Sequence, residues 1–152
     1  MQGLEPALVD RTLEPLLALD GTDTRAFEIN VAGPSALLVA KLHKIAERVG
    51  AGDPGRIDDK DALDVLRLLR GSDGAVLAAT IAALARDPLA GDATLASLDH
   101  LRDLFGTETA AGPRMAVRAT TPLEDAAIIA ASCVALASDL LTAVEMQRLV
   151  GA

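Results

Sequence analysis

Two neighbouring segments of the sequence, residues 34–50 and 58–70, carry apolar side chains at the spacing of an amphipathic helix. In each segment the apolar residues recur every three or four positions, which places them on one side of a helix with about 3.6 residues per turn. A chain with two such segments in succession is expected to form a helical hairpin that buries both stripes. The stripes are Leu38, Leu42, Ile45 and Val49, and Ala62, Val65, Leu66 and Leu69.

Charged residues border these stripes on both predicted helices. Lys41, Lys44 and Arg48 are spaced i, i+3 and i+7, so they share one edge of the first helix. Asp61 and Asp64 take an edge of the second helix. If the helices pack antiparallel, Lys41 and Arg48 lie near the two aspartates at the rim of the interface. From this geometry alone we favour an ion-pair network that sets the register of the helices, with a ligand site as the alternative.

Residues 1–33 show the patterns of extended structure. Glu5–Arg11 and Thr12–Leu19 are strand candidates, and the sequence DGTD at residues 20–23 is a turn signal. Residues 26–32 alternate apolar and polar side chains, as a strand with one apolar face does. We therefore predict an antiparallel pair between Leu13–Leu19 and Ala26–Ala32. Two strands alone are marginally stable, so this pair is expected to need a packed helix or a further strand.

Helical patterns continue from residue 34 to the end of the sequence. Beyond residues 34–50 and 58–71, they predict helices over residues 73–86 and 92–105 and a long final helix that reaches about residue 149. The sequence TPLE at residues 121–124 is typical of a capped helix start. Loops, the first of them mobile, are expected at residues 51–56 and 106–113. The predicted fold is mainly α (α+β): a β-hairpin at residues 1–33, then about five helices that form a bundle at residues 34–152.

Composition restricts the classes of protein to which the chain can belong. Of its 152 residues, 51% are hydrophobic and 24% are charged, which is typical of a folded soluble domain. Trp and Tyr are absent, so aromatic platforms for stacking bases are excluded. The formal net charge of -8 disfavours attraction to nucleic acid or to an anionic membrane. The apolar stretch at residues 126–137 is too short for an ordinary membrane span, and we expect a cytoplasmic protein.

Other chemically interesting side chains stand apart from one another in the sequence. Cys133 lies in an apolar run and is expected to be a buried, inert thiol. His43 and His100 are expected at the surface or at a helix edge, and no His, Cys and Glu residues have the spacing of a metal site. The glycine-rich residues 50–55 lack the pattern of a phosphate-binding loop. The apolar final helix belongs either to the core or to the interface of a homo-oligomer, and the sequence leaves both open.

The segment GPSALLVAKLHKIAER, followed by DKDALDVLRLL, resembles the C-terminal half of nucleotidyltransferase-fold proteins of the AbiEii toxin type. In that family a helix with a conserved Lys and, seven residues later, an Arg precedes a helix that begins with a K/R-D-x-x-D pattern. The resemblance covers about residues 3–71 and includes the preceding strand, AFEINVAGP. The motif positions are filled here by Lys41, Arg48, Lys60, Asp61 and Asp64.

The resemblance implies a role for each of these residues. Lys41, together with Arg48 and Lys60, would bind the phosphates of a nucleoside triphosphate, because a compact cation neutralises phosphate charge. Asp61 and Asp64 would be catalytic-site carboxylates. The activity of the family is transfer of a nucleoside monophosphate from the triphosphate to RNA or protein, with Mg²⁺ held by an upstream D-x-D motif.

No D-x-D motif of that kind precedes the matched segment in this sequence. The resemblance therefore implies a chain that is inactive alone and that works with an upstream nucleotidyltransferase half or with an antitoxin-type protein. The alternative is a non-enzymatic helical module for interaction or dimerisation.

Overall fold

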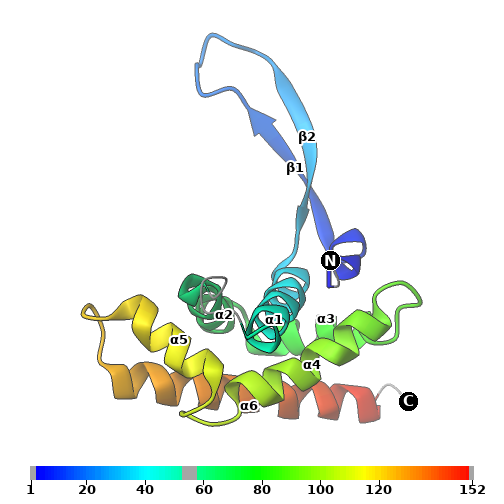
Figure 1. Ribbon diagram of the computed structural model, residues 1–152. Coiled ribbons are helices and arrows are strands. Elements are labelled where there is room, and N and C mark those ends of the chain that lie inside the picture. Colours follow the sequence, from blue (N-terminus) through cyan, green and yellow to red (C-terminus); the bar gives the residue numbers. More distant parts are fainter. Residues whose placement is uncertain (1–2, 53–57, 151–152) are drawn as a thin grey trace.

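A two-stranded β-hairpin precedes six α-helices in the computed structural model, which describes residues 3–52 and 58–150 (Figure 1). The mainly α fold with an N-terminal hairpin is confirmed, with one helix more than predicted. The loop expected at residues 51–56 lies mostly outside the described residues. The elements are the 3-10 helix η1 (Glu5–Leu8), β1 (Arg11–Leu17), β2 (Ala26–Ala32), α1 (Pro34–Gly50), α2 (Asp59–Gly71), α3 (Gly74–Leu84), α4 (Gly91–Phe105), α5 (Ala111–Thr120) and α6 (Ala126–Val150).

The hairpin projects away from the helices as an arm (Figure 1). β1 and β2 pair antiparallel, from Arg11 opposite Ala32 to Leu17 opposite Ala26. The predicted pairing is therefore correct, although β1 begins and ends two residues earlier than the predicted strand Leu13–Leu19. All residues of β1 and all but the last residue of β2 are exposed, because the arm stands clear of the helical body.

The strand predicted over Glu5–Arg11 is wrong except for Arg11, which begins β1: residues 5–8 form η1, and residues 9 and 10 form a turn. Pro6 lies in the first turn of η1, where its fixed φ suits a helix and its missing N–H is not needed. The carbonyl of Pro6 accepts hydrogen bonds from the N–H groups of Val9 (3.0 Å) and Asp10 (2.8 Å). These bonds close the turn just before β1 begins.

Asp10 ties the base of the arm to the start of α1. Its carbonyl accepts a hydrogen bond from the Gly33 N–H (2.9 Å), and its Oδ2 accepts one from the Ala36 N–H (2.9 Å). Gly33 occupies the N-cap position of α1 and has no side chain with which to cap it, so Asp10 satisfies that helix end from a distant point of the chain. A β-carbon at position 33 would collide with the Asp10 carboxylate, which explains the glycine there.

We expect Asp10→Ala to lower the free energy of unfolding by about 1 kcal/mol, because α1 would lose its N-terminal cap. Urea unfolding followed by circular dichroism measures this loss. The matched control is Asp20→Ala, which removes a carboxylate that accepts hydrogen bonds from Thr22 in the exposed turn of the arm. The control should leave the unfolding of the helices unchanged, and equal losses in the two variants would contradict the capping role of Asp10.

The core lies among the helices and is aliphatic apart from one phenylalanine. Each of the six helices contributes apolar residues to a single buried cluster. α6 lies on the side of the body opposite the arm and packs against α3, α4 and α5 (Figure 1). The largest side chains that are completely or almost completely buried include Phe105, Leu38, Leu42, Ile45, Leu66, Ile81, Leu101 and Ile129.

α5 is the helix that the sequence pattern misses. The sequence predicts a loop over residues 106–113, a stretch rich in Gly, Thr and Ala. In the structure Gly112 and Pro113 occupy the first turn of α5, where proline is tolerated. A β-carbon on Gly112 would come within 2.6 Å of the Phe105 ring, so glycine lets α5 pack closely on the end of α4. This requirement comes from tertiary packing and leaves no periodic signal in the sequence.

The final helix begins later than the TPLE sequence predicts. α6 starts at Ala126, and Oδ1 of Asp125 accepts hydrogen bonds from the N–H groups of Ala127 (2.9 Å) and Ile128 (3.1 Å). Asp125 therefore provides the cap that was expected from the residues around Thr121.

α6 is also longer than its most apolar stretch suggests. Residues 126–137, expected from the sequence to be too short to cross a membrane, are only about half of α6. The whole helix extends over 25 residues, and the mean hydropathy of its most apolar window is 2.0. By length and composition this helix could span a membrane, although core helices of soluble proteins have the same properties. In that window 28% of the residues are buried within the body. One such helix is compatible with a soluble protein.

Candidate functional site

Asp61 is a buried carboxylate surrounded by three cations from α1. Nζ of Lys41 and Nζ of Lys44 lie 2.9 and 2.8 Å from its Oδ1, and Nη1 of Arg48 lies 2.9 Å from its Oδ2. The sequence spacing correctly predicts that these side chains meet, but it places Asp61 at the rim of the interface. Asp61 is 2% exposed, because the long stems of the three cationic side chains cover it.

Asp64 extends this network by one turn of α2. Nζ of Lys41 lies 2.7 Å from Asp64 Oδ2, and Nη1 of Arg67 lies 3.4 Å from Asp64 Oδ1. Lys41 in the middle of α1 reaches both Asp64 and Asp61, while Arg48 near the end of α1 reaches only Asp61, so the two helices run antiparallel, the arrangement considered from the sequence. The α1–α2 charge cluster consists of Lys41, Lys44, Arg48, Asp61 and Asp64.

The charges of the cluster stabilise one another despite burial. Burial raises the pKa of Asp61, but the hydrogen bonds and charges of Lys44 and Lys41 outweigh it, and the pKa lies below its ordinary value of 3.8. Burial lowers the pKa of Lys41, but its hydrogen bonds to Asp64 and Asp61 outweigh that effect and raise the pKa above 10.5. Both groups are therefore charged throughout the physiological pH range.

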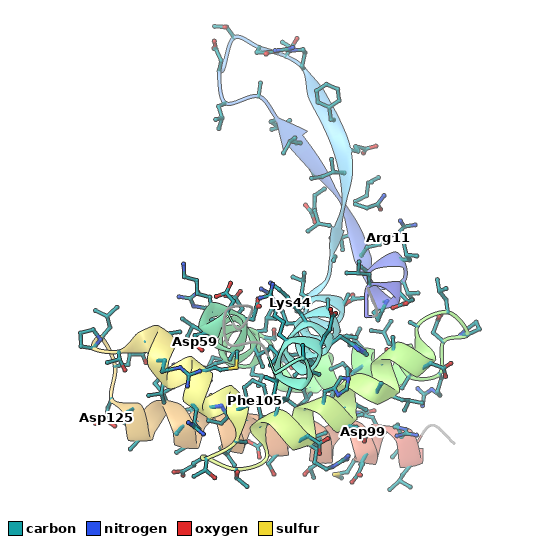
Figure 2. All side chains as sticks on the ribbon, in the orientation of Figure 1. Arg11, Lys44, Asp59, Asp99, Phe105 and Asp125 are labelled. Atoms are coloured by element: carbon teal, nitrogen blue, oxygen red, sulfur yellow. The ribbon has the colours of Figure 1, made fainter. Side chains whose placement is uncertain are left out.

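Positive charge is in excess at this site. Four cationic side chains, those of the cluster and Arg67, face two carboxylates, so two positive charges are not balanced by these ion pairs. The side chains of Lys41, Lys44 and Arg48 are 28%, 41% and 29% exposed, whereas that of Asp61 is 3% exposed. Lys44 lies on the side of the body from which the arm projects (Figure 2). An approaching anion would therefore meet these cations and the partly exposed Asp64 carboxylate, with the Asp61 carboxylate behind them.

Lys60 is the sequence-predicted site residue that the structure does not bring into the cluster. It is exposed, and no ion pair of its side chain occurs within residues 3–52 and 58–150. Its backbone N–H donates a hydrogen bond to Asp58 Oδ1 at 3.1 Å, which caps α2. Lys60 and Asp61 point in directions about 100° apart around the helix, so both cannot face α1.

A groove of about 430 Å³ lies next to the cluster, between α1 and α2. Lys41, Asp64 and Arg67 form its charged side, and Pro34, Leu37 and Leu68 supply apolar side chains. Leu37 is 43% exposed, so part of this apolar wall is open to solvent. The sequence gives no sign of the groove or of Arg67, because the groove depends on how far apart the two helices pack. An apolar wall beside cations suits a ligand that has both an apolar and an anionic part.

The carboxylates of Asp61 and Asp64 do not suit a divalent cation; the resemblance itself assigns Mg²⁺ to an upstream D-x-D motif and not to these residues. The oxygens of Asp61 and Asp64 lie within 2.7–3.4 Å of ammonium or guanidinium nitrogens. A divalent cation placed between these carboxylates would meet the surplus positive charge at short range. In the described part of the chain, no group of three or more His, Cys, Asp or Glu residues is arranged to hold a metal ion. The carboxylates of the α1–α2 charge cluster are therefore paired with cationic side chains.

The two histidines lie together at the junction of α1 and α4. His43 is 7% exposed and its Nε2 lies 2.8 Å from the Ala93 carbonyl oxygen, so the expectation of a surface position is wrong for this residue. Its ring meets that of His100 edge to face, with centroids 5.0 Å apart. A β-carbon on Gly3 would collide with the His43 ring, so the N-terminal segment covers this histidine.

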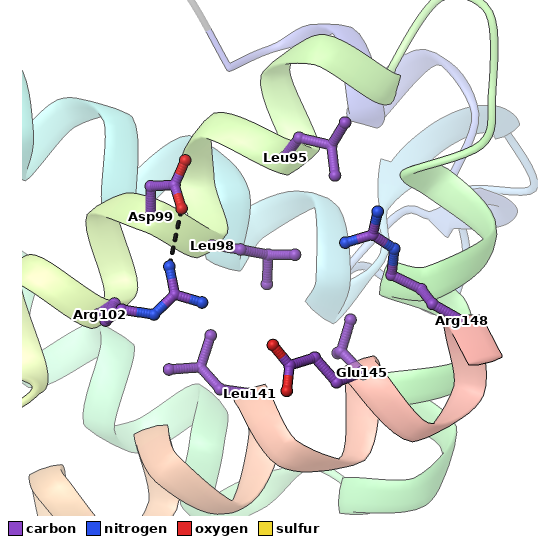
Figure 3. Close-up of a pocket in the computed structure, with 8 residues that line it drawn as sticks. Leu95, Leu98, Asp99, Arg102, Leu141, Glu145 and Arg148 are labelled. Carbon is purple, nitrogen blue, oxygen red and sulfur yellow. Dashed lines mark hydrogen bonds and ion pairs between the residues drawn. The ribbon is translucent and has the colours of Figure 1, made fainter.

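The cavity between α4 and α6 and the thiol of Cys133 are less suited to binding a ligand than the charge cluster. A cavity of about 220 Å³ between α4 and α6 is lined by Asp99, Arg102, Glu145 and Arg148 together with aliphatic residues (Figure 3). Its two acids and two bases are balanced, and Arg102 is paired with Asp99 at 2.8 Å. Cys133 is completely buried, as predicted, and burial raises the pKa of its thiol to about 11, so it stays protonated and inert.

Comparison with known proteins leaves the resemblance to AbiEii-type proteins as a prediction. No family model matches the chain, and no curated protein or solved structure shows significant similarity to it.

Proposed function

We propose that the α1–α2 charge cluster binds the phosphates of a nucleoside triphosphate. The observation that carries this proposal is the surplus of partly exposed cations around a buried carboxylate. Hydrogen bonds from ammonium and guanidinium groups to phosphate oxygens are among the stronger ones in proteins. Asp61 holds Lys41, Lys44 and Arg48 in place, so the phosphates would find their partners already oriented. The adjoining apolar groove would receive the nucleoside.

The chain would then be the nucleotide-binding part of a cytoplasmic, nucleotidyltransferase-like protein. Such a protein transfers a nucleoside monophosphate to RNA or protein, and its metal is held by a D-x-D half that would come from an upstream segment or a partner chain. Asp61 and Asp64 would lie beside the triphosphate as catalytic-site carboxylates, positioned by the cations of α1. An antitoxin-type partner follows from the same resemblance.

Loss of Lys41 should weaken the binding of ATP about tenfold, which corresponds to about 1.4 kcal/mol. Lys41 contacts both carboxylates and borders the groove, so its ammonium group is placed for both the phosphate and the nucleoside side of the site. Isothermal titration calorimetry of Lys41→Ala and the unchanged chain, at one fixed salt concentration, measures the difference. Charge screening should weaken both affinities at higher salt.

The matched control for this titration is Arg102→Ala. Arg102 is also a cation paired with an aspartate, but it lies on α4 at the smaller cavity. Its loss should leave ATP binding unchanged. Binding that is equally strong in Lys41→Ala would show that the cluster is an ion-pair network that sets helix register and no more. Absence of binding, even with a D-x-D half supplied, would also overturn the proposal.

A specific observation supports the second candidate, a module for interaction or dimerisation. The arm exposes Leu13, Leu16, Leu17 and Phe27 by 53–69%, although two strands alone are marginally stable in water. Exposed apolar side chains gathered on one projecting element are typical of a protein interface. This function is compatible with nucleotide binding, because the arm and the charge cluster are different surfaces.

A further inference from the structure

The two faces of β2 differ in character, because Phe27, Ile29 and Val31 point to one side and Glu28 and Asn30 to the other. In an antiparallel pair, residues directly opposite each other share a face. The register therefore places Thr12 with Val31, Glu14 with Ile29 and Leu16 with Phe27 on one face. Four of these six side chains are large and apolar, and they are between 41% and 63% exposed. On β2 this face is apolar throughout, whereas on β1 Glu14 interrupts it, and its apolar side chains are left exposed.

The two edges of the arm also differ. β1 contains Pro15, which has no N–H to donate to a further strand. β2 (Ala26–Ala32) contains no proline, so its outer edge can donate and accept hydrogen bonds along its whole length. An added strand is therefore expected on β2.

We propose that β2 pairs antiparallel with β2 of a second copy of this chain, forming a four-stranded sheet across a two-fold axis. Ile29 is the central residue of β2 and would lie opposite Ile29 of the second copy. Phe27 would then lie opposite Val31, and Glu28 opposite Asn30. The apolar faces of the two arms become one face, and no like charges meet at the seam.

Other registers of the same pairing are less favourable. A shift of one residue would join the apolar side of one β2 to the side of the other β2 that carries Glu28 and Asn30. A shift that centres the pairing on Glu28 places the two Glu28 carboxylates opposite each other, which is repulsive. A shift to Asn30 leaves Phe27 beyond the paired segment. The sequence AFEINVA is thus self-complementary in the register centred on Ile29, which is why a second copy is the occupant that we infer.

The mass of the protein in solution tests this proposal. Light scattering coupled to gel filtration, with refractive-index detection because Trp and Tyr are absent, should give twice 15.6 kDa as concentration rises. Ile29→Lys should shift the protein to the monomer. The new ammonium would face its copy across the seam, while Glu14 on β1 can pair with it within the arm. Leu17→Lys, on the opposite face, is the control and should remain dimeric.

Cross-linking tests the register independently of affinity. With Cys133 replaced by alanine, Ile29→Cys should form a disulfide-linked dimer under oxidising conditions, and Phe27→Cys should not, because Phe27 faces Val31. A monomer at every soluble concentration would overturn the proposal. So would a dimer that persists in Ile29→Lys and is broken by Ile128→Lys, which would place the interface on α6. ATP titration of Ile29→Lys keeps the two proposals separate, since the charge cluster is unchanged in that variant.

Discussion

Replacing Asp61 with alanine is expected to lower the free energy of unfolding by about 3 kcal/mol. The substitution would leave Lys41, Lys44 and Arg48 facing one another without the carboxylate that they share. Removal of one partner from a buried ion pair is strongly destabilising, because the remaining charges have already lost part of their hydration. Partial exposure of the three cations keeps the expected loss at the lower end of the range for buried pairs. Urea unfolding measures it.

The pH dependence of this loss follows from the pKa of Asp61. That pKa is lower in the folded protein than the ordinary value of 3.8, so the carboxylate contributes its full stabilisation above pH 3.8. The contribution disappears as the pH falls through the lower, folded-state pKa. The difference in unfolding free energy between the unchanged chain and Asp61→Ala should therefore be complete at pH 7 and smaller at pH 3.

Asp64→Ala is the matched control for Asp61. Asp64 contacts Lys41 as well, but its side chain is 36% exposed, so water can replace the lost contacts. We expect a loss of about 1 kcal/mol or less. Equal losses for the two aspartates, or a difference that does not change with pH, would contradict the central position of Asp61 in the cluster.

Phe105→Ala should be the most destabilising single change, with a loss of about 4 kcal/mol. The Phe105 side chain is completely buried at the end of α4, and its ring packs on Gly112 at the start of α5. Truncation would leave a cavity that the small neighbouring residues cannot fill. We expect a lower midpoint in thermal unfolding and faster amide hydrogen exchange in α5 than in α1.

The other phenylalanine of the chain, Phe27, provides the matched control for Phe105→Ala. Phe27 lies on the arm and is 63% exposed. Phe27→Ala should change the free energy of unfolding by about 0.5 kcal/mol or less at concentrations where the protein is monomeric. A comparable loss in both variants would mean that the arm and the body unfold as one unit and that Phe105 has no special position in the core.

The features that could be predicted from the sequence are those with a local periodic signal. α1 and α2 follow from their apolar stripes, and the meeting of Lys41 and Arg48 with Asp61 and Asp64 follows from helical spacing. The pairing of the strands follows from the alternation in residues 26–32 and from the DGTD turn that precedes them. Each of these features is signalled by a pattern within one short segment, which a single sequence contains, even where the contact itself joins two such segments.

Features that depend on distant contacts could not be predicted in this way. α5 begins with glycine and proline, and the reason for Gly112 is the ring of Phe105 on another helix. The burial of Asp61 depends on the stems of side chains from α1. Asp10 caps a helix that begins 24 residues later in the chain, at Pro34. In each case the residue type is explained by a contact formed after the elements pack together.

The most direct test of the nucleotide-binding proposal is to find where a polyphosphate binds. Inorganic triphosphate can be titrated into ¹⁵N-labelled protein and followed through the backbone amide signals. The largest shifts should occur in residues 38–50 of α1 and 59–67 of α2, around Lys41, Lys44 and Arg48, and they should decrease strongly in Lys41→Ala. Shifts of the same size around Arg102 and Arg148, or none in α1 and α2, would contradict the assignment of this cluster as the phosphate site.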